Sequence, residues 1–142
     1  MTNKMKILYI EDMEECYKKT KEALGSEFDI DWRNNPFDAI NAIIRHLPEY
    51  SAAIIDVNLS YNPNLPSDKQ SADGLELIKI IKKESKRWSK IQKTNIPVIC
   101  ASSNGTQYEK ASYEAGADRF LWKKELWEGK GKEILEELIR KA

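Results

Sequence analysis

The chain has 142 residues, 41% of them hydrophobic, and its 23 basic residues balance its 23 acidic ones. This length suits a single domain spanning residues 1–142, and the balanced charge gives no reason to expect binding to nucleic acid or to an anionic membrane. No apolar run approaches the roughly 20 residues of a membrane-spanning helix, and no signal peptide is evident, so a cytoplasmic protein is expected.

Predicted strands and helices alternate along the chain. Apolar runs bounded by turn residues predict strands over five segments: 6–10, 28–32, 51–56, 96–102 and 118–122. Apolar residues at helical spacing predict helices over five others: 13–24, 35–48, 73–91, 106–115 and 132–140. Asn35 before Pro36 suits an N-cap followed by the first helical position. Cys16 and Cys100 fall at apolar positions and are predicted to be buried, unpaired thiols.

This alternation predicts an α/β fold, with a five-stranded parallel sheet and helices on both faces. The segment 28–32 alternates apolar and polar residues, so one of its faces should be wet and the strand should lie at an edge. The order 2-1-3-4-5, a flavodoxin-like doubly wound sheet, meets this condition with right-handed crossovers. Its winding reverses between the first and third strands, and ligands bind beyond the carboxyl ends of the strands at such a point.

Acidic residues mark that predicted reversal point. Glu11 and Asp12 follow the first strand directly, and Asp56 ends the third strand. Neighbouring carboxylates repel one another and are costly to desolvate, so a cation is expected among them. Oxygen ligands at this density suit a hard divalent cation, and the pattern therefore predicts a Mg²⁺ site.

Two further strand ends converge on the same edge of the sheet. The fourth strand brings Ser102 or Ser103 to it, and the fifth brings Lys123 or Lys124. In phosphoryl transfer, a metal and a lysine neutralise the phosphoryl oxygens, a hydroxyl bonds one of them, and a carboxylate can act as the nucleophile. The four strand ends together indicate this chemistry.

These segments resemble the receiver domains of two-component response regulators over nearly the whole chain. The resemblance is carried by four segments in order: "ILYIEDMEE", "AAIIDVNLS", "IPVICASSN" and "AGADRFLWKK". Since no output domain follows the last predicted helix, a stand-alone receiver similar to the chemotaxis regulators is expected.

The resemblance implies that Asp56 accepts a phosphoryl group from a histidine kinase or a phosphotransfer protein. It implies that Lys123 pairs with that phosphoryl group. It also implies a Mg²⁺ site with four protein ligands: Glu11, Asp12, Asp56 and the backbone carbonyl of Asn58. Such a protein catalyses its own phosphoryl transfer and dephosphorylation without being a conventional enzyme.

The resemblance further implies a conformational switch. Ser102 would move to bond the phosphoryl group, and Phe120 would then turn inward. This movement would alter the face formed by the fourth helix, the fifth strand and the fifth helix, and so control a downstream protein that the sequence does not identify.

The chain departs from the family pattern at two places. Ser60 stands where the family often has proline, and residues 60–72 form a polar insertion before Asp73 and Gly74, predicted to be an irregular loop. Lys124 stands where the family usually has proline after the lysine. A cis bond there would cost about 2.5–4 kcal/mol, so either a trans bond with a shifted loop or a strained cis bond is expected.

Three other functions fit the sequence less well than a receiver domain. A nucleotide-binding or flavin-binding domain is excluded because no glycine-rich phosphate loop follows the first strand. An aspartyl-phosphate hydrolase typically has a second acid two residues after the nucleophile, where Asn58 stands here. A scaffold that is never phosphorylated remains an alternative because of the departure at Lys124, and the hydrolase is a weaker one.

Overall fold

The computed structural model describes residues 4–59, 63–66, 71–103 and 106–142. Within them, five segments are strands: β1 (Met5–Ile10), β2 (Phe28–Arg33), β3 (Ala52–Asp56), β4 (Val98–Ser102) and β5 (Arg119–Trp122). Six segments are α-helices: α1 (Glu14–Leu24), α2 (Pro36–His46), α3 (Asp73–Trp88), α4 (Glu109–Ala115), α5 (Lys123–Trp127) and α6 (Gly129–Lys141). A 3-10 turn, η1 (Leu47–Glu49), follows α2.

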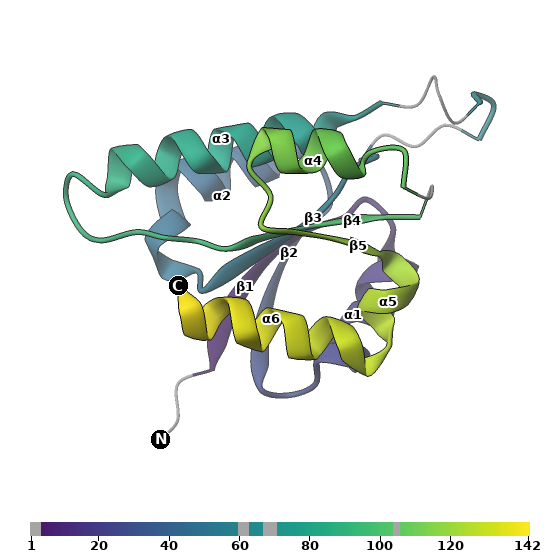
Figure 1. The fold of residues 1–142 in the computed structure, drawn as a ribbon, viewed down its shortest axis with the longest axis horizontal. Coiled ribbons are helices and arrows are strands. Elements are labelled where there is room, and N and C mark those ends of the chain that lie inside the picture. Colours follow the sequence, from purple (N-terminus) through teal and green to yellow (C-terminus); the bar gives the residue numbers. More distant parts are fainter. Residues whose placement is uncertain (1–3, 60–62, 67–70, 104–105) are drawn as a thin grey trace.

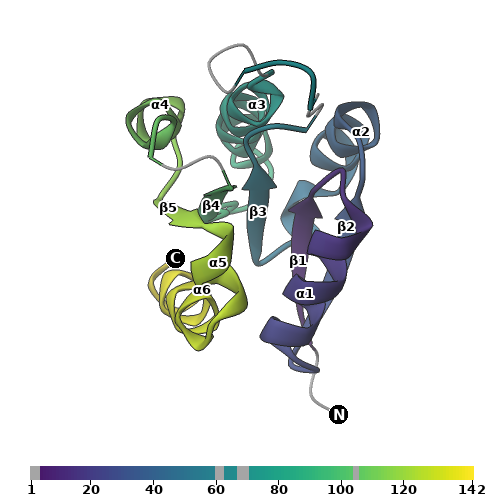
Figure 2. The same ribbon diagram turned by 90° about the vertical axis from the view of Figure 1, so that its right-hand side faces the viewer.

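The five strands form one sheet in the order β2-β1-β3-β4-β5, and every neighbouring pair is parallel. Helices α2, α3 and α4 cover one face of the sheet, and α1, α5 and α6 cover the other (Figures 1 and 2). The predicted fold class and strand order are thus confirmed. Strand β2, the half-exposed strand, lies at an edge as expected.

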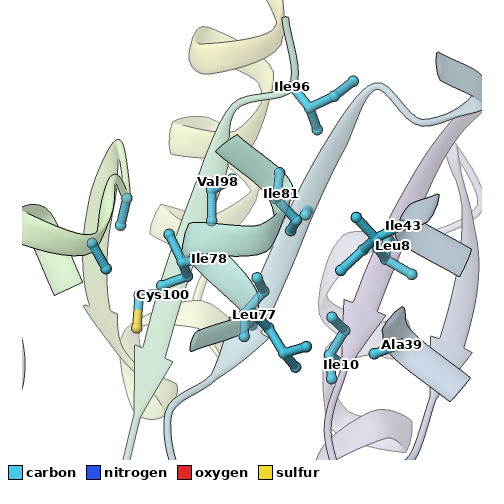
Figure 3. Close-up of a cluster of buried hydrophobic side chains, with 14 of the residues drawn as sticks. Leu8, Ile10, Ala39, Ile43, Leu77, Ile78, Ile81, Ile96, Val98 and Cys100 are labelled. Atoms are coloured by element: carbon cyan, nitrogen blue, oxygen red, sulfur yellow. The ribbon is translucent and has the colours of Figure 1, made fainter. Parts of the chain in front are cut away.

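Each face of the sheet has its own buried cluster, because side chains alternate along a strand. Leu8 and Ile10 point to the cluster beneath α2 and α3, whereas Ile7 and Tyr9 point to the cluster beneath α1 and α6. Figure 3 shows the first cluster, in which helix and strand side chains interlock: Leu8, Ile10, Ala39, Ile43, Leu77, Ile78, Ile81, Val98 and Cys100. Because both faces of the sheet are buried, the central strands are apolar along their whole length rather than at every second residue.

Local signals in the sequence act as predicted at several points. The Asn35 side chain accepts a hydrogen bond of 2.9 Å from the backbone nitrogen of Asp38, so it caps α2, and Pro36 is the first helical residue. Cys16 and Cys100 are both buried and free. The third and fourth predicted helices are shorter than expected, since α3 ends at residue 88 and α4 begins at residue 109.

The structure corrects the prediction for the C-terminal region, where α5 was not expected and α6 begins at Gly129 rather than at Lys132. Helix α5 directly follows β5. The Glu125 carboxylate accepts a hydrogen bond of 3.1 Å from the backbone nitrogen of Trp122, which satisfies an otherwise unpaired donor at the start of the helix. Five residues are too few to show a helical period, and this explains the omission.

The peptide bond between Lys123 and Lys124 is trans, as is every peptide bond in the described residues. The alternative of a strained cis bond is therefore wrong. The helical start at Lys123 takes the place of the shifted loop that was expected with a trans bond.

The predicted insertion at residues 60–72 lies mostly outside the described residues, which include only 63–66 and 71–72 of it. Among the described helices, none has both the length and the apolar character needed to cross a membrane.

Candidate phosphoryl-transfer site

Three acidic side chains meet at the carboxyl ends of neighbouring strands. Glu11 and Asp12 follow β1, Asp56 ends β3, and β1 pairs directly with β3. One carboxylate oxygen from each residue lies within 4.8 Å of those of the other two. Glu11 is fully buried and Asp56 is 3% exposed, so water screens this cluster poorly.

Lys123 reaches into this cluster from the first turn of α5. Its Nζ atom lies 2.6 Å from Glu11 Oε1 and 3.5 Å from Asp56 Oδ2, and the lysine is 5% exposed. Three carboxylates and one ammonium group leave two negative charges uncompensated when all are ionised. A divalent cation would balance that charge.

Asp12 shows where such a cation fits. Both Glu11 oxygens are engaged, one by Lys123 and the other by the backbone nitrogen of Asp12 at 3.1 Å. By contrast, Asp12 Oδ1 is buried and has no hydrogen-bond partner in the described part of the chain. A buried carboxylate oxygen without a partner is costly, and a metal ion would remove that cost.

The acids have different pKa values because their surroundings differ. Burial and the neighbouring Glu11 raise the pKa of Asp56 well above its usual value, although Lys123 opposes the rise. Burial and Glu11 also raise the pKa of Asp12 to about 6. Burial opposes ionisation of Glu11 as well, but the hydrogen bond with Asp56 and the charge of Lys123 lower its pKa overall. Without a cation, the site therefore favours a proton on Asp56.

The backbone at Asp56 is enclosed by the first turn of α3. A Cβ atom at Gly74 would lie 2.1 Å from the carbonyl oxygen of Asp56 and 2.8 Å from Cα of Val57. The Gly74 nitrogen donates a hydrogen bond of 2.9 Å to the carbonyl of Val57. Glycine is therefore required at position 74 by space, a role that the sequence analysis missed.

Asn58 lies beside the acids and is 4% exposed. Its side-chain amide donates to the carbonyl of Ser71 at 2.5 Å, and its backbone nitrogen lies 3.4 Å from Asp56 Oδ1. These bonds hold the end of β3 against the start of α3. The metal-binding role of the Asn58 carbonyl stays a prediction.

The two residues expected to act as a switch lie on neighbouring strands. Ser102 is fully buried at the end of β4 and pairs in register with Trp122 of β5. Phe120 is 7% exposed and packs in the first buried cluster, the one that contains Leu8 and Ile10, so its side chain already lies inward. Its backbone nitrogen donates to the hydroxyl of Tyr113 on α4 at 3.1 Å.

A buried polar chain that the sequence analysis missed joins α5 to α1. Trp127 Nε1 donates to the hydroxyl of Thr20 at 3.0 Å, and that hydroxyl donates to the Tyr9 hydroxyl at 3.0 Å. The three residues are far apart in sequence, and no local pattern indicates that they meet. Lys123 and Trp127 both belong to the short helix α5. These hydrogen bonds therefore anchor the helix that carries the lysine.

Comparison with known proteins finds solved structures only, since no protein-family model and no curated protein matches the chain. The receiver domain of a sensor histidine kinase from Pseudomonas aeruginosa, with magnesium coordinated in its active-site cleft, is 21% identical. That match covers 97% of this chain and 99% of that chain, with a TM-score of 0.66. A CheY-like receiver domain protein from Methanospirillum hungatei is 20% identical over 99% of this chain and 100% of that chain, with a TM-score of 0.65.

The beryllofluoride-activated receiver domain of DrrB is 19% identical, and its match covers 94% of this chain and 99% of that chain with a TM-score of 0.64. The chain has the receiver-domain fold. In this receiver fold the acidic cluster stands at the carboxyl ends of β1 and β3, the place where doubly wound sheets bind ligands.

Proposed function

We propose that this protein is a signalling switch in which Asp56 accepts a phosphoryl group. The observation that carries the proposal is the cluster of Glu11, Asp12 and Asp56 in a receiver fold, with Lys123 paired to the first and last of these acids. A structure of similar fold holds magnesium in its active-site cleft, and another is activated by beryllofluoride. Both support the proposal.

Asp56 would act as the nucleophile. One of its carboxylate oxygens forms a bond to phosphorus while the bond from phosphorus to the donor's histidine nitrogen breaks. Lys123, whose Nζ lies 3.5 Å from Asp56 Oδ2, is close enough for its ammonium group to pair with the transferred oxygens. Its bond to Glu11 holds it there before the transfer.

Mg²⁺ bound by the acidic cluster would supply positive charge that offsets the phosphoryl oxygens. Asp12 is the best-placed protein ligand because its buried Oδ1 has no other partner in the described residues. Asp56 and the backbone carbonyl of Asn58 would complete the set. Glu11, with both oxygens engaged by Lys123 and Asp12, would act mainly by holding those two residues.

The switch would run from Ser102 to α4 and β5. The Ser102 hydroxyl would bond the phosphoryl group, which carries a charge and so makes the hydrogen bond strong. Strand β5 is tied to α4 through Phe120 and Tyr113, so a change at the end of β4 can reach both elements. The same site would also catalyse removal of the phosphoryl group from Asp56.

The proposed partners are proteins. A histidine kinase or a phosphotransfer protein would supply the phosphoryl group. An unknown downstream protein would bind the surface formed by α4, β5 and α6, the last of which is the fifth predicted helix. Neither nucleic acid nor membrane is expected, because acidic and basic residues balance at 23 each. The free thiols of Cys16 and Cys100 support a reducing compartment, and we place the protein in the cytoplasm.

Labelling with acetyl phosphate in the presence and absence of Mg²⁺ tests this function. Asp56 should be the only labelled residue, the label should require Mg²⁺, and it should show the base lability of an acyl phosphate. Asp56→Asn should abolish labelling, because an amide is not a nucleophile here. Asp29→Asn changes an exposed acid on β2 and serves as the matched control that keeps full labelling.

Other outcomes identify the alternatives. Equal labelling of the Asp56→Asn variant would show that a different acid is the acceptor. No labelling of the unmodified protein would favour a scaffold that is never phosphorylated. Continuous rapid turnover of a phosphate ester would favour an aspartyl-phosphate hydrolase.

A further inference from the structure

Helix α2 carries a stripe of three apolar side chains, the exposed Phe37 and Ile44 with the half-buried Ile40 between them, and the polar Asn41 lies beside it. Phe37 is 84% exposed and Ile44 is 42% exposed, although the opposite face of the helix is buried in the core. The spacing of three and four residues places the members of the stripe side by side. A single exposed apolar side chain is ordinary, but several apolar side chains in line along one helix indicate a contact surface.

The stripe lies where a second molecule can reach it. Figure 2 shows α2 at the outer end of its helical layer, with α3 on one side only. The stripe residues and Asp38 together line a shallow groove on the surface of α2. None of them belongs to the proposed phosphoryl-transfer site.

Charged residues flank the stripe in a self-complementary pattern. Asp38 lies near the first turn of α2 and Arg45 in the last turn, and both are exposed. Their separation of seven residues, or two helical turns, puts them on the same flank of the helix. Asn41 lies midway between them. An antiparallel copy of the helix centred near Asn41 would therefore bring its Arg45 close to Asp38, and its Ile44 close to Phe37.

We propose that the α2 stripe is the contact between two copies of this chain, packed with their α2 helices antiparallel about a two-fold axis near Asn41. Two-fold packing makes each contact occur twice, so both Asp38–Arg45 pairs form together. A second copy is the occupant favoured here because it satisfies the apolar stripe and both charges of its flank at once. One helix face is a small interface, so the dimer should be reversible and concentration-dependent.

Charge reversal tests this pairing by sedimentation equilibrium up to about 1 mM, a range that detects weak dimers. Asp38→Arg and Arg45→Asp should each weaken self-association on the order of tenfold, because each creates two like-charge pairs. An equimolar mixture of the two variants should associate again. The arginines of one chain then face the acids of the other, which a merely damaged helix cannot mimic.

In both variants Asn35 Oδ1 can still accept from the backbone nitrogen of residue 38, although Asp38→Arg loses the bond from Asn35 Nδ2 to Asp38 Oδ2. Phe37→Ser, which removes the most exposed apolar side chain of the stripe, should also weaken the dimer by tenfold or more. An Asn41→Cys variant locates the axis. It should form an intermolecular disulfide under mild oxidation, whereas Glu136→Cys, exposed on α6, should not.

Several outcomes would overturn the proposal. The unmodified chain could remain monomeric at all concentrations, which would leave the stripe to a different protein. A dimer could persist unchanged in Phe37→Ser, which would place the contact on another face. The mixture of charge-reversed chains could stay monomeric, which would exclude antiparallel pairing. The assay uses no phosphoryl donor, so it stands apart from the proposed function.

Discussion

Buried charge is compensated residue by residue in this protein. Lys123 lies between Glu11 and Asp56, and burial would favour its neutral form, but the two carboxylates raise the pKa of the lysine overall. Within the described residues Asp12 Oδ1 has no hydrogen-bond partner, and burial and the neighbouring Glu11 raise the pKa of Asp12 to about 6, so its ionised form is disfavoured. Asp12 Oδ1 is therefore the oxygen of this cluster that a bound cation would stabilise most.

The first prediction concerns that cation. Mg²⁺ that binds only the folded protein adds RT ln(1 + [Mg²⁺]/Kd), about 1.4 kcal/mol at ten times Kd, so the melting temperature should rise by about 5 °C. Asp12→Asn should abolish most of this rise. It should also raise the melting temperature without Mg²⁺ at pH 8, because it removes a buried charge with a raised pKa.

Calorimetric or fluorescence melting curves across a Mg²⁺ titration measure both effects. The matched control is Asp29→Asn, which changes an exposed acid and should respond to Mg²⁺ as the unmodified chain does. A melting curve of the unmodified protein that ignores Mg²⁺ would refute the metal site.

The second prediction concerns Gly74. An added Cβ atom would lie 2.1 Å from the Asp56 carbonyl, which is backbone and cannot move aside cheaply. Gly74→Ala should lower the free energy of unfolding by about 1–3 kcal/mol, as overpacking does in cores, and should slow phosphorylation of Asp56. Urea denaturation measures the first effect and acetyl phosphate labelling the second.

Gly129→Ala is the control, since a Cβ atom there meets nothing within 4 Å. It should leave the free energy of unfolding unchanged or slightly raised, because alanine favours helix. Equal destabilisation by both substitutions would point to chain flexibility rather than to the close contact at Asp56.

Among the elements, α5 decides where the lysine stands. This helix has only five residues, too few to be stable alone, so its position depends on tertiary contacts. The hydrogen bonds from Trp127 to Thr20 and from Thr20 to Tyr9 supply one contact, and the buried Leu126 supplies another. Lys19 also lies over the Trp127 ring, 4.7 Å from its centroid.

The third prediction tests this anchor. Thr20→Val keeps the shape of the side chain but leaves Tyr9 and Trp127 without their shared partner. We expect a loss of about 1–3 kcal/mol in the free energy of unfolding, the cost of leaving a buried polar group unsatisfied. Amide hydrogen exchange should accelerate over residues 123–127 more than in the central strands.

Two tryptophans provide the comparison for this anchor. Trp127→Phe removes the indole donor and should reproduce the faster exchange in α5, whereas Trp122→Phe changes a side chain that is 43% exposed and should not. If Thr20→Val leaves exchange in α5 unchanged, the helix is held by apolar packing alone.

At the scale of the whole molecule, phosphorylation of Asp56 would have to change the surface formed by α4 and β5. Ser102 and Phe120 are buried on adjacent strands, and Tyr113 ties β5 to α4. Packed elements of this kind move between discrete arrangements rather than deform continuously. A ligand can shift that equilibrium only by binding one arrangement better than the other. Phe120 already lies inward here, so the proposed switch would not require this side chain to rotate from an exposed position.

The fourth prediction addresses this coupling. Ser102→Ala should still accept a phosphoryl group on Asp56, because the nucleophile and Lys123 are unchanged. Its amide signals over residues 106–122 should shift much less on phosphorylation, or on binding of beryllofluoride, than those of the unmodified protein. Heteronuclear NMR spectra with and without the phosphoryl mimic measure this difference. Shifts of the usual size in the variant would mean that Ser102 does not couple the site to α4 and β5.

Much of the architecture follows from local sequence signals. Apolar periods identified the five strands, and the half-exposed period of 28–32 placed β2 at an edge. Once the strand order is known, the positions of Glu11, Asp12 and Asp56 at neighbouring strand ends follow, because parallel strands present their carboxyl ends on one side. Period and strand-end chemistry are properties of short segments, so the sequence contains them directly.

Other features depend on residues that are distant in the chain. The bond between Lys123 and Glu11, the anchor of Trp127 on Thr20 and the close approach of Gly74 to Asp56 each join segments that no local pattern relates. Helix α5 is too short to show a period, and its position depends on those same contacts. Packing between elements settles such features, since their energies arise only when the folded chain brings the partners together.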